Sequence, residues 1–442
     1  MCCAWEEAHH TSFALSTFEI FYLTGTRGQL RNALVVGEIA LTLALLAGAG
    51  LLLRSFARLR SADIGVNPHN VLTMVFNLPE AKYNSLNLRR QFFDQLVDSA
   101  NHTPGIVAAT VSTEIPLQGG SNGYLKVDDN PDPTLSTKLV GWNWITPDYF
   151  RTFEIPLDEG RGFTSADVDR AAQTGMKLFD LYRAASTSGT PLKIPPDLEL
   201  VAVISRGMAR TFWPNKDPVG RSFHWNDVKV TVIGVVGDVR EYGIRENVKP
   251  QAYFPYTLVL PAQGYARLTV RTHVPPLTVL PAIRHHVHSL DSTLAIVRPA
   301  TMEDLIASNM QDATIQTFLL CTFAILALVL ATVGLYGVMS YVVTQRTREI
   351  GIRVAVGAQR MDVLRLILKQ GALLTLSGVT LGLFAALALT RLLSSLLYGV
   401  GSSDPLTFTC VAVLLGFVAL MAHYVPGLRA TRIDPMIALR YE

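Results

Sequence analysis

Four apolar stretches stand out along the chain, and a long region of shorter patterns separates the first stretch from the other three. Because about 20 apolar residues suffice for a helix to cross the hydrocarbon core of a membrane, each stretch predicts a transmembrane helix. The four predicted helices cover residues 31–54, 318–343, 372–392 and 406–425. Residues 301–317 contain no proline or glycine, so we expect the second helix to extend outward from the membrane as a stalk.

Glu38 is the one ionisable residue inside the first apolar stretch, ALVVGEIALTLALLAGAGLLL. An acid at membrane depth points to a functional site, here a proton-linked or substrate-linked carboxylate. Arg31 lies two helical turns earlier on roughly the same face, so Glu38 can also sit near the inner headgroups. We favour this second interpretation, and the first stays open. Gly48 and Gly50, with alanine neighbours, form a small-residue face that lets another helix approach closely.

Between residues 55 and 312 no apolar run is long enough to span a membrane. Short apolar runs predict six strands there, and amphipathic patterns predict three helices. The strands are expected at 71–76, 107–111, 139–145, 201–204, 228–236 and 266–270, and the helices at 88–100, 206–213 and 277–290. This mixture predicts an α+β domain of two lobes. A weakly patterned stretch at 184–196, rich in Gly, Ser and Pro, predicts an inserted loop between the lobes.

The composition agrees with a membrane protein that carries a substantial soluble part. Hydrophobic residues make up 49% and charged residues 17% of the 442-residue chain, whereas charged residues are about a quarter of an ordinary soluble domain. The net charge is only +3, and the cations gather beside the apolar stretches, which favours membrane topology over nucleic-acid binding. None of the four cysteines falls between residues 55 and 312, so we expect that domain to hold without disulfides.

The densest cluster of cations lies between the second and third predicted helices, in YVVTQRTREIGIRVAVGAQRMDVLR, residues 341–365. It contains five arginines against two acids, Glu349 and Asp362, and membrane-flanking loops with an arginine excess stay in the cytoplasm. Its apolar residues recur at helical spacings, which predicts an amphipathic helix over about 346–365. A generic positive loop is the alternative. The same charge rule places a lead-in of residues 1–30 and the basic tail 426–442 in the cytoplasm, and the domain of residues 55–312 outside.

The segment TREIGIRVAVGAQRMDVLRLIL resembles the loop after the second span of MacB/FtsX-type permeases of ABC transporters. In that family the loop forms the coupling helix, which receives force from a cytoplasmic ATPase. WITPDYFRTFEIPLDEGRGFTSAD and VAVISRGMARTFWPNKDPVGRSF are similar to phrases of the family's periplasmic core domain, with Ser205-Arg206 where Asn-Glu is usual. The chain most resembles the duplicated orphan permeases, whose chains carry this module twice, so its single copy suggests a half-length member or a fragment.

The resemblance implies an α-helical membrane protein with four transmembrane helices and a large α+β extracytoplasmic domain. It would serve as the permease subunit of an ABC-type exporter in a bacterial inner membrane, in an efflux role, with no cofactor and no metal. The implied partners are a cytoplasmic ABC ATPase, a second permease copy, a periplasmic or outer-membrane protein, and membrane lipids. The implied coupling residues are Arg346, Arg348, Glu349, Ile350, Gly351, Ile352, Arg353, Val354 and Gly357.

Within the coupling helix, Arg348, Glu349 and Arg353 are expected to form ion pairs with the ATPase or with lipid headgroups. The three apolar residues at 350, 352 and 354 would fill a docking groove or pack back on the spans. The glycines at 351 and 357 would permit close approach. The substrate and the identity of the ATPase do not follow from the sequence.

Other candidate chemistry is weaker. None of the nine lysines follows a glycine, so the chain lacks a phosphate-binding P-loop and depends on a partner ATPase. Gly119–Gly123 satisfies G-x-S-x-G around Ser121, but its neighbours predict a flexible loop and a strand rather than a nucleophile elbow. His285, His286 and His288 spread over different faces of a helix, which disfavours metal chelation. Asp238 and Arg240 follow a predicted strand without a second acid or nucleophile, so we interpret them as structural.

Two alternatives to an exporter remain. One is a non-transporting FtsX-type regulator, in which the same motion activates an external cell-wall hydrolase. The other is a membrane-anchored enzyme that uses Ser121 or the histidines.

Overall fold

The computed structural model describes residues 6–127, 132–188, 194–258, 265–347, 349, 352, 359–392, 397–401 and 403–430. The chain divides into two compact units. The helical unit comprises residues 1–61 and 312–442, and the α+β unit comprises residues 62–311.

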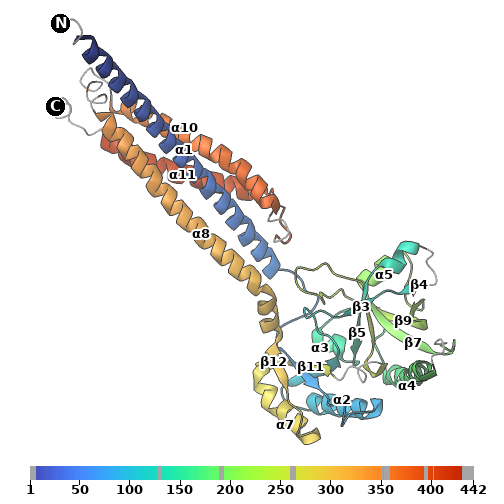
Figure 1. The fold of residues 1–442 in the computed structure, drawn as a ribbon. Helices are drawn as coiled ribbons and strands as arrows, with labels where there is room; N and C mark the ends of the chain where they lie inside the picture. The colour runs from blue at the N-terminus through green and yellow to red at the C-terminus, as the bar shows by residue number, and fades with distance from the viewer. Residues whose placement is uncertain are drawn as a thin grey trace. The chain divides into compact units, whose positions relative to one another are not determined.

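The helical unit contains four long helices, drawn in Figure 1. They are α1 (Glu6–Arg60), α8 (Met302–Gln345), α10 (Arg360–Leu392) and α11 (Pro405–Ala430). Each includes a segment long enough and apolar enough to cross a membrane, at residues 30–60, 302–345, 367–392 and 405–429. The predicted fold class is therefore confirmed for this unit, and α8 is continuous through residues 302–317, where we expected a stalk.

Three helix ends differ from the expected ones. Helix α1 is continuous from Glu6, so the described part of the lead-in is helical. Helix α10 begins at Arg360 and takes up the last residues of the predicted coupling helix, since the Asp362 carboxylate accepts a hydrogen bond from the Gln359 amide at 3.2 Å and caps the helix there. Helix α11 continues past Pro426 to Ala430, which is tolerated because neighbouring groups can satisfy the freed carbonyl in a membrane helix.

Small residues set the packing of α1. A Cβ built on Gly378 of α10 would lie 2.7 Å from the Ile39 Cβ, and one on Gly382 would lie 3.0 Å from the Ala40 Cα. Gly50 of α1 meets Thr407 of α11 in the same way, at 2.8 Å. The small-residue face predicted around Gly50 is therefore used for close helix approach, and α1 packs tightly on both α10 and α11.

Among its described residues, the α+β unit is built on one 12-stranded sheet. Its main path runs β12-β1-β11-β2-β5-β10-β7-β9-β8-β4, while β3 pairs with β5 and β6 pairs with β9. The strands are β1 (Val71–Asn77), β2 (Ile106–Ser112), β3 (Ser121–Gly123), β4 (Lys126–Val127), β5 (Val140–Ile145), β6 (Leu157–Gly160), β7 (Glu199–Ser205), β8 (Ser222–Trp225), β9 (Val228–Val236), β10 (Gln251–Pro255), β11 (Tyr265–Thr272) and β12 (Val297–Thr301). All six predicted strands are present.

Two separate apolar cores make the two lobes predicted from sequence. In the first lobe α2 (Leu86–Asn101) and α7 (Leu280–Leu290) pack on β1, β2 and β11. In the second, α4 (Ser165–Ser188) and α5 (Arg206–Phe212) pack on β5, β7, β9 and β10. The two halves of the sheet meet between β2 and β5, where the register comprises the single pair Ser112↔Ile145. Two more backbone hydrogen bonds cross this join, from the Thr113 amide to the Trp144 carbonyl and from the Thr146 amide to the Val111 carbonyl, each at 3.0 Å. We call this join between the lobes the hinge.

Two local expectations were wrong. Residues 184–188, predicted as part of a loop between the lobes, continue helix α4, and the elements that flank the predicted loop, α4 and β7, both belong to the second lobe. Ser121–Gly123, predicted as a flexible loop, form β3 and pair with Trp142, Gly141 and Val140 of β5. The absence of a Cβ at Gly123 makes this pairing possible, because a Cβ there would lie 2.7 Å from the Trp142 ring.

Candidate functional site

The predicted coupling segment is described only in part. Arg346, Glu349 and Ile352 are among the described residues, and the Ile352 side chain is 47% exposed. The remaining predicted coupling residues lie outside the described residues: Arg348, Ile350, Gly351, Arg353, Val354 and Gly357. The roles assigned to them therefore stay predictions.

Two arginine–tyrosine contacts join α1 and α11 to α8, the helix before this segment. The Arg31 guanidinium of α1 lies 4.7 Å from the ring centroid of Tyr341 on α8, a cation–π geometry. Arg429 of α11 donates a hydrogen bond to the Tyr336 hydroxyl of α8 at 2.7 Å. Arginines at this end therefore brace α8, the helix that leads directly into the coupling segment.

Glu38 of α1 faces α8 rather than Arg31. A Cβ on Gly334 of α8 would clash with the Glu38 carboxylate, so the acid occupies the space that this glycine leaves. The side chain is half-buried. One turn further along α1, Thr42 donates a hydrogen bond to the Ala327 carbonyl of α8 at 3.3 Å. Glu38 and Thr42 of α1 therefore both lie where α1 packs against α8.

At their other ends α1 and α11 are joined by an ion pair between Arg54 and Asp404. Asp404 also accepts hydrogen bonds from the Thr407 hydroxyl at 2.6 Å and the Thr407 amide at 3.1 Å. The Thr407 hydroxyl, followed by its amide and Arg54, lowers the pKa of Asp404, so this carboxylate stays charged. Ser55 accepts a hydrogen bond from the Tyr398 amide at 2.8 Å. These contacts hold α1 to the loop between α10 and α11.

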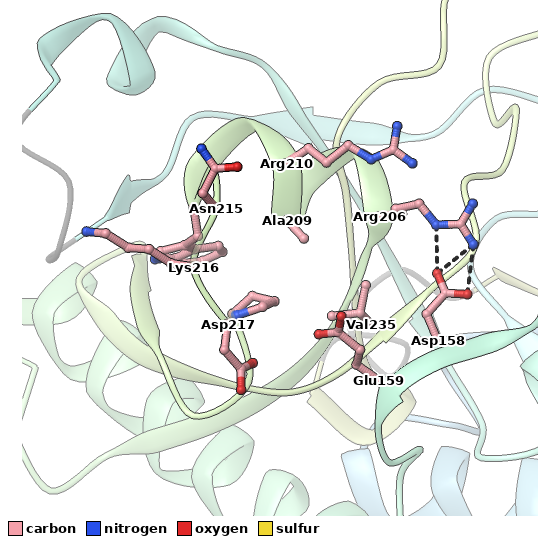
Figure 2. A pocket seen from close by; sticks show the side chains of 11 residues that line it. Asp158, Glu159, Arg206, Ala209, Arg210, Asn215, Lys216, Asp217 and Val235 are labelled. Carbon is pink, nitrogen blue, oxygen red and sulfur yellow. Dashed lines mark hydrogen bonds and ion pairs between the residues drawn. The ribbon is translucent and has the colours of Figure 1, made fainter.

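The α+β unit contains a groove of about 690 Å³ between α5, the turn after it, and strand β6 (Figure 2). Its walls carry six charged side chains together with Asn215 and a small apolar floor. The lining residues are Asp158, Glu159, Arg206, Ala209, Arg210, Trp213, Asn215, Lys216, Asp217, Pro218 and Val235. Ligand sites for drug-like molecules are mostly apolar with a few polar groups, so this groove suits a polar partner better.

One ion pair in the groove is fixed. Arg206 of α5 donates two hydrogen bonds to Asp158 of β6, at 2.8 Å and 2.7 Å, as Figure 2 shows. The hydrogen bond to Asp158 raises the pKa of Arg206. This pair closes one side of the groove, while Asn215 and Lys216 occupy the opposite side in the same view. The groove was not predicted from the sequence, in which the Ser205-Arg206 departure from the family phrase is a visible signal of it.

A pair of buried acids lies near the hinge. Glu241 is 4% exposed and Glu114, which follows β2, is 7% exposed. Burial, then the charge of Glu114, raises the pKa of Glu241 to about 8, against a smaller opposing effect of Tyr253. Burial also raises the pKa of Glu114, although Arg267 lies 3.7 Å away. Within the described part of the chain, neither carboxylate oxygen of Glu241 has a well-formed hydrogen bond, so the carboxyl is favoured in its neutral form.

The residues of the alternative enzyme hypothesis do not form a catalytic arrangement among the described residues. Ser121 lies on β3, and strand β4 rather than a helix follows it. His285, His286 and His288 lie on α7, where His286 contacts the Thr103 hydroxyl at 2.9 Å. No group of three potential metal ligands occurs in the part of the chain that the structure describes.

Asp238 and Arg240 have structural contacts. The Asp238 carboxylate accepts a hydrogen bond from the Gly207 amide at the start of α5, at 2.5 Å. The Arg240 side chain donates to the carbonyls of Asp63, Ile244 and Glu246, at 3.0, 3.3 and 2.6 Å.

Two regions of the chain match models of known protein families. Residues 33–285, more than half of the chain, match the family model of the MacB-like periplasmic core domain, and residues 321–435 match that of the FtsX-like permease C-terminal region. A macrolide export ATP-binding/permease protein MacB of Bradyrhizobium diazoefficiens is 31% identical over 258 residues, covering 56% of this chain and 39% of that protein. MacB 2 of Aeromonas hydrophila is 26% identical over 326 residues, covering 70% and 44%. The chain spans less than half the length of these relatives.

Two solved structures are similar to parts of the chain. The periplasmic region of MacB from Actinobacillus actinomycetemcomitans is 19% identical with a TM-score of 0.34, and the match covers 55% of this chain and 94% of that one. The extracellular domain of the noncanonic ABC-type transporter YknZ, from Gram-positive bacteria, is 14% identical with a TM-score of 0.30, covering 51% and 100%.

Proposed function

The chain belongs to the MacB/FtsX-like family of ABC transporter permeases, and we propose that it is the permease part of an ABC-type exporter that transmits motion to its α+β unit. The observation that carries this proposal is the arrangement along the chain. A MacB-like core domain lies between the first and second of four helices that can cross a membrane, and an FtsX-like region follows it.

The force is proposed to come from a partner ABC ATPase that docks on the 346–365 segment. Both the arginine excess there and the bracing of α8 by Arg31 and Arg429 support this role. By the positive-inside rule this segment and both ends of the chain would be cytoplasmic, and the α+β unit extracytoplasmic. Labelling of single cysteines by an impermeant maleimide in whole cells would test that orientation.

A second copy of the chain is the proposed partner in the membrane. Between residues 318 and 333, α8 presents large apolar side chains that stay exposed in the single chain. They include Phe318 at 70%, Phe323 at 55% and Leu330 at 63% exposure. In a membrane these side chains would contact lipid or a neighbouring helix, and small residues elsewhere on α8 would allow close approach. Cross-linking in the membrane would reveal the dimer.

A regulatory role is the second candidate, and the character of the groove favours it. Six charged side chains around a small apolar floor suit contact with a polar protein surface better than capture of an apolar molecule. In this version, motion in the α+β unit would activate an extracytoplasmic cell-wall hydrolase. Loss of export in a deletion strain would favour the exporter, whereas unchanged export with loss of hydrolase activity would favour the regulator.

Co-purification tests the premise that both candidate functions share, namely that an ABC ATPase docks on the 346–365 segment. The tagged chain would be extracted in mild detergent, and bound proteins identified by mass spectrometry, for wild type and for Arg348→Glu/Arg353→Glu. Arg245→Glu is the matched control, because Arg245 is exposed and lies in the α+β unit. We expect an ABC ATPase with wild type and with the control but not with the double variant. An ATPase that binds the double variant equally well would refute the coupling role.

A further inference from the structure

We propose that Arg240 is a positioning residue that links the segment leaving α1, residues 62–70, to the groove between α5 and β6. This inference rests on the proposed function, since it names the route by which motion of α1 would reach the groove. All the contacts that carry it lie inside the α+β unit.

The loop that contains Arg240, residues 237–250 between β9 and β10, binds the segment that leaves α1. The Arg240 amide donates to the Ile64 carbonyl at 3.1 Å, and its side chain donates to the Asp63 carbonyl at 3.0 Å. Gly65 has a φ of +79°, and a Cβ built on it would collide with the Asp238 carbonyl. Backbone therefore packs directly on backbone here, and a shift of residues 63–65 must displace the loop.

The same loop holds both walls of the groove. Its Gly237 amide donates to the Pro156 carbonyl at 3.0 Å, one residue before β6 begins. Its Asp238 carboxylate accepts from the Gly207 amide at 2.5 Å, at the start of α5. Strand β6 supplies Asp158 and Glu159 to the groove, and α5 supplies Arg206, Ala209 and Arg210. A displacement of the loop therefore acts on both walls, which face each other across the Arg206–Asp158 pair.

The loop also reaches the hinge between the lobes. The Arg240 carbonyl accepts a hydrogen bond from the Leu117 amide at 3.0 Å, and the Glu241 carbonyl accepts one from the Gly119 amide at 2.8 Å. Leu117 is buried with a φ of +71°, a conformation that costs a non-glycine residue energy and persists only when its surroundings hold it. This stretch follows β2, the strand that joins the two halves of the sheet.

The Arg240 side chain binds both the segment leaving α1, through the Asp63 carbonyl, and later residues of its own loop, through the carbonyls of Ile244 and Glu246. A guanidinium can bridge several acceptors because its donors are fixed in a plane. It therefore makes the loop and the segment move as one piece, which is what transmission requires.

The test measures the width of the groove in the purified full-length chain. Spin labels would be placed at Glu159→Cys on β6 and Arg210→Cys on α5, with Cys2, Cys3, Cys321 and Cys410 replaced by serine. Distances between the labels would be measured by pulsed electron paramagnetic resonance. Arg240→Ala removes the link, Arg240→Lys keeps the charge, and Gly65→Ala disturbs the contact from the side of α1.

Gly105→Ala is the matched control. Gly105 also has a positive φ, of +96°, and a Cβ there would lie 3.1 Å from Val274 in the first lobe. It therefore also places a side chain at a positive φ, but without touching the loop or the groove.

We expect Arg240→Ala and Gly65→Ala to shift the distance by about 2 Å or more, the scale of loop and domain rearrangements. Arg240→Lys should restore part of the wild-type distance, and Gly105→Ala should leave it unchanged. A shift with Arg240→Ala but none with Gly65→Ala would overturn the proposal, because Arg240 would then shape the groove only locally. No shift with either variant, or an equal shift with the control, would overturn it as well. The distance measurement needs no ATPase, so a negative result there can be told apart from a negative result in the co-purification.

Discussion

The buried carboxyl of Glu241 predicts a strong dependence of the stability of the α+β unit on pH. In the folded chain its pKa is about 8 instead of 4.5, chiefly because burial disfavours the charged form. Below pH 4.5 the carboxyl is neutral in both the folded and the unfolded chain. Between pH 4.5 and pH 8 the unfolded chain releases this proton and the folded chain keeps it, so stability falls as pH rises.

The size of the effect follows from the gap between the two pKa values. Each pKa unit corresponds to about 1.4 kcal/mol. A gap of about 3.5 units therefore lowers the free energy of unfolding by on the order of 5 kcal/mol between acid and alkaline solution. A domain of about 150–250 residues loses about 2–4 °C in melting midpoint per kcal/mol. From pH 5 upward about 3 units of that gap remain, or about 4 kcal/mol, so we expect the midpoint of the α+β unit to be about 8–16 °C lower at pH 9 than at pH 5.

Glu241→Gln isolates this contribution, because the amide has the shape of the neutral acid and does not titrate. Four of the five tryptophans lie in the second lobe, namely Trp142, Trp144, Trp213 and Trp225, so the intrinsic fluorescence of the full chain reports its unfolding. The variant should match wild type at pH 5 and melt well above it at pH 9. Glu246→Gln, an exposed change in the same loop, should behave like wild type. Equal pH dependence in Glu241→Gln and wild type would refute the reasoning.

Other substitutions test the packing and the groove. Gly382→Leu should destabilise the helical unit by about 1–3 kcal/mol through overpacking against α1, measured as a lower melting temperature in detergent; Gly416→Leu, where a Cβ meets nothing within 4 Å, should not. Arg271→Ala leaves the carbonyls of Asn67, His69 and Thr152 without their donor. Because a buried unpaired group costs about 1–3 kcal/mol, amide exchange should become faster across residues 67–70. Arg206→Ala should change stability by no more than about 1 kcal/mol, so a strong effect on partner binding would reflect the groove itself.

The strands that the sequence predicted have buried faces, although β10, which is buried throughout, was not among them. In β9 buried and half-buried residues alternate, and a period of two detects that pattern directly. Strand β6 could not be found in this way, since its four residues, LDEG, are all exposed. Its extended form comes from pairing with β9, which is remote in sequence. The same holds for β3, whose conformation is set by Trp142 and its neighbours on β5.

The candidate site was predictable where it rests on local composition and hidden where it rests on tertiary contacts. The arginines of the 346–365 segment are visible as a cluster, so a cationic loop could be predicted from them. Glu114 and Glu241 carry no signal in their own surroundings, because their burial depends on segments that meet only in the fold. Arg240 was visible only as a residue after a predicted strand, because the carbonyls of Asp63, Ile244 and Glu246 that its side chain binds have no side-chain signature.

The pairing of strands in the sheet determines where motion transmitted through Arg240 would act. The chain enters the α+β unit through β1 and leaves it through β12, and these two strands pair directly, with Leu72 opposite Thr301. His69 and Glu303 lie 3.3 Å apart beside them. Both connections to the helices therefore lie at the same edge of the first lobe. In the proposed mechanism, Arg240 would carry motion of one of them to the second lobe as well, and the groove, whose two walls are bound by the Arg240 loop, would change with it.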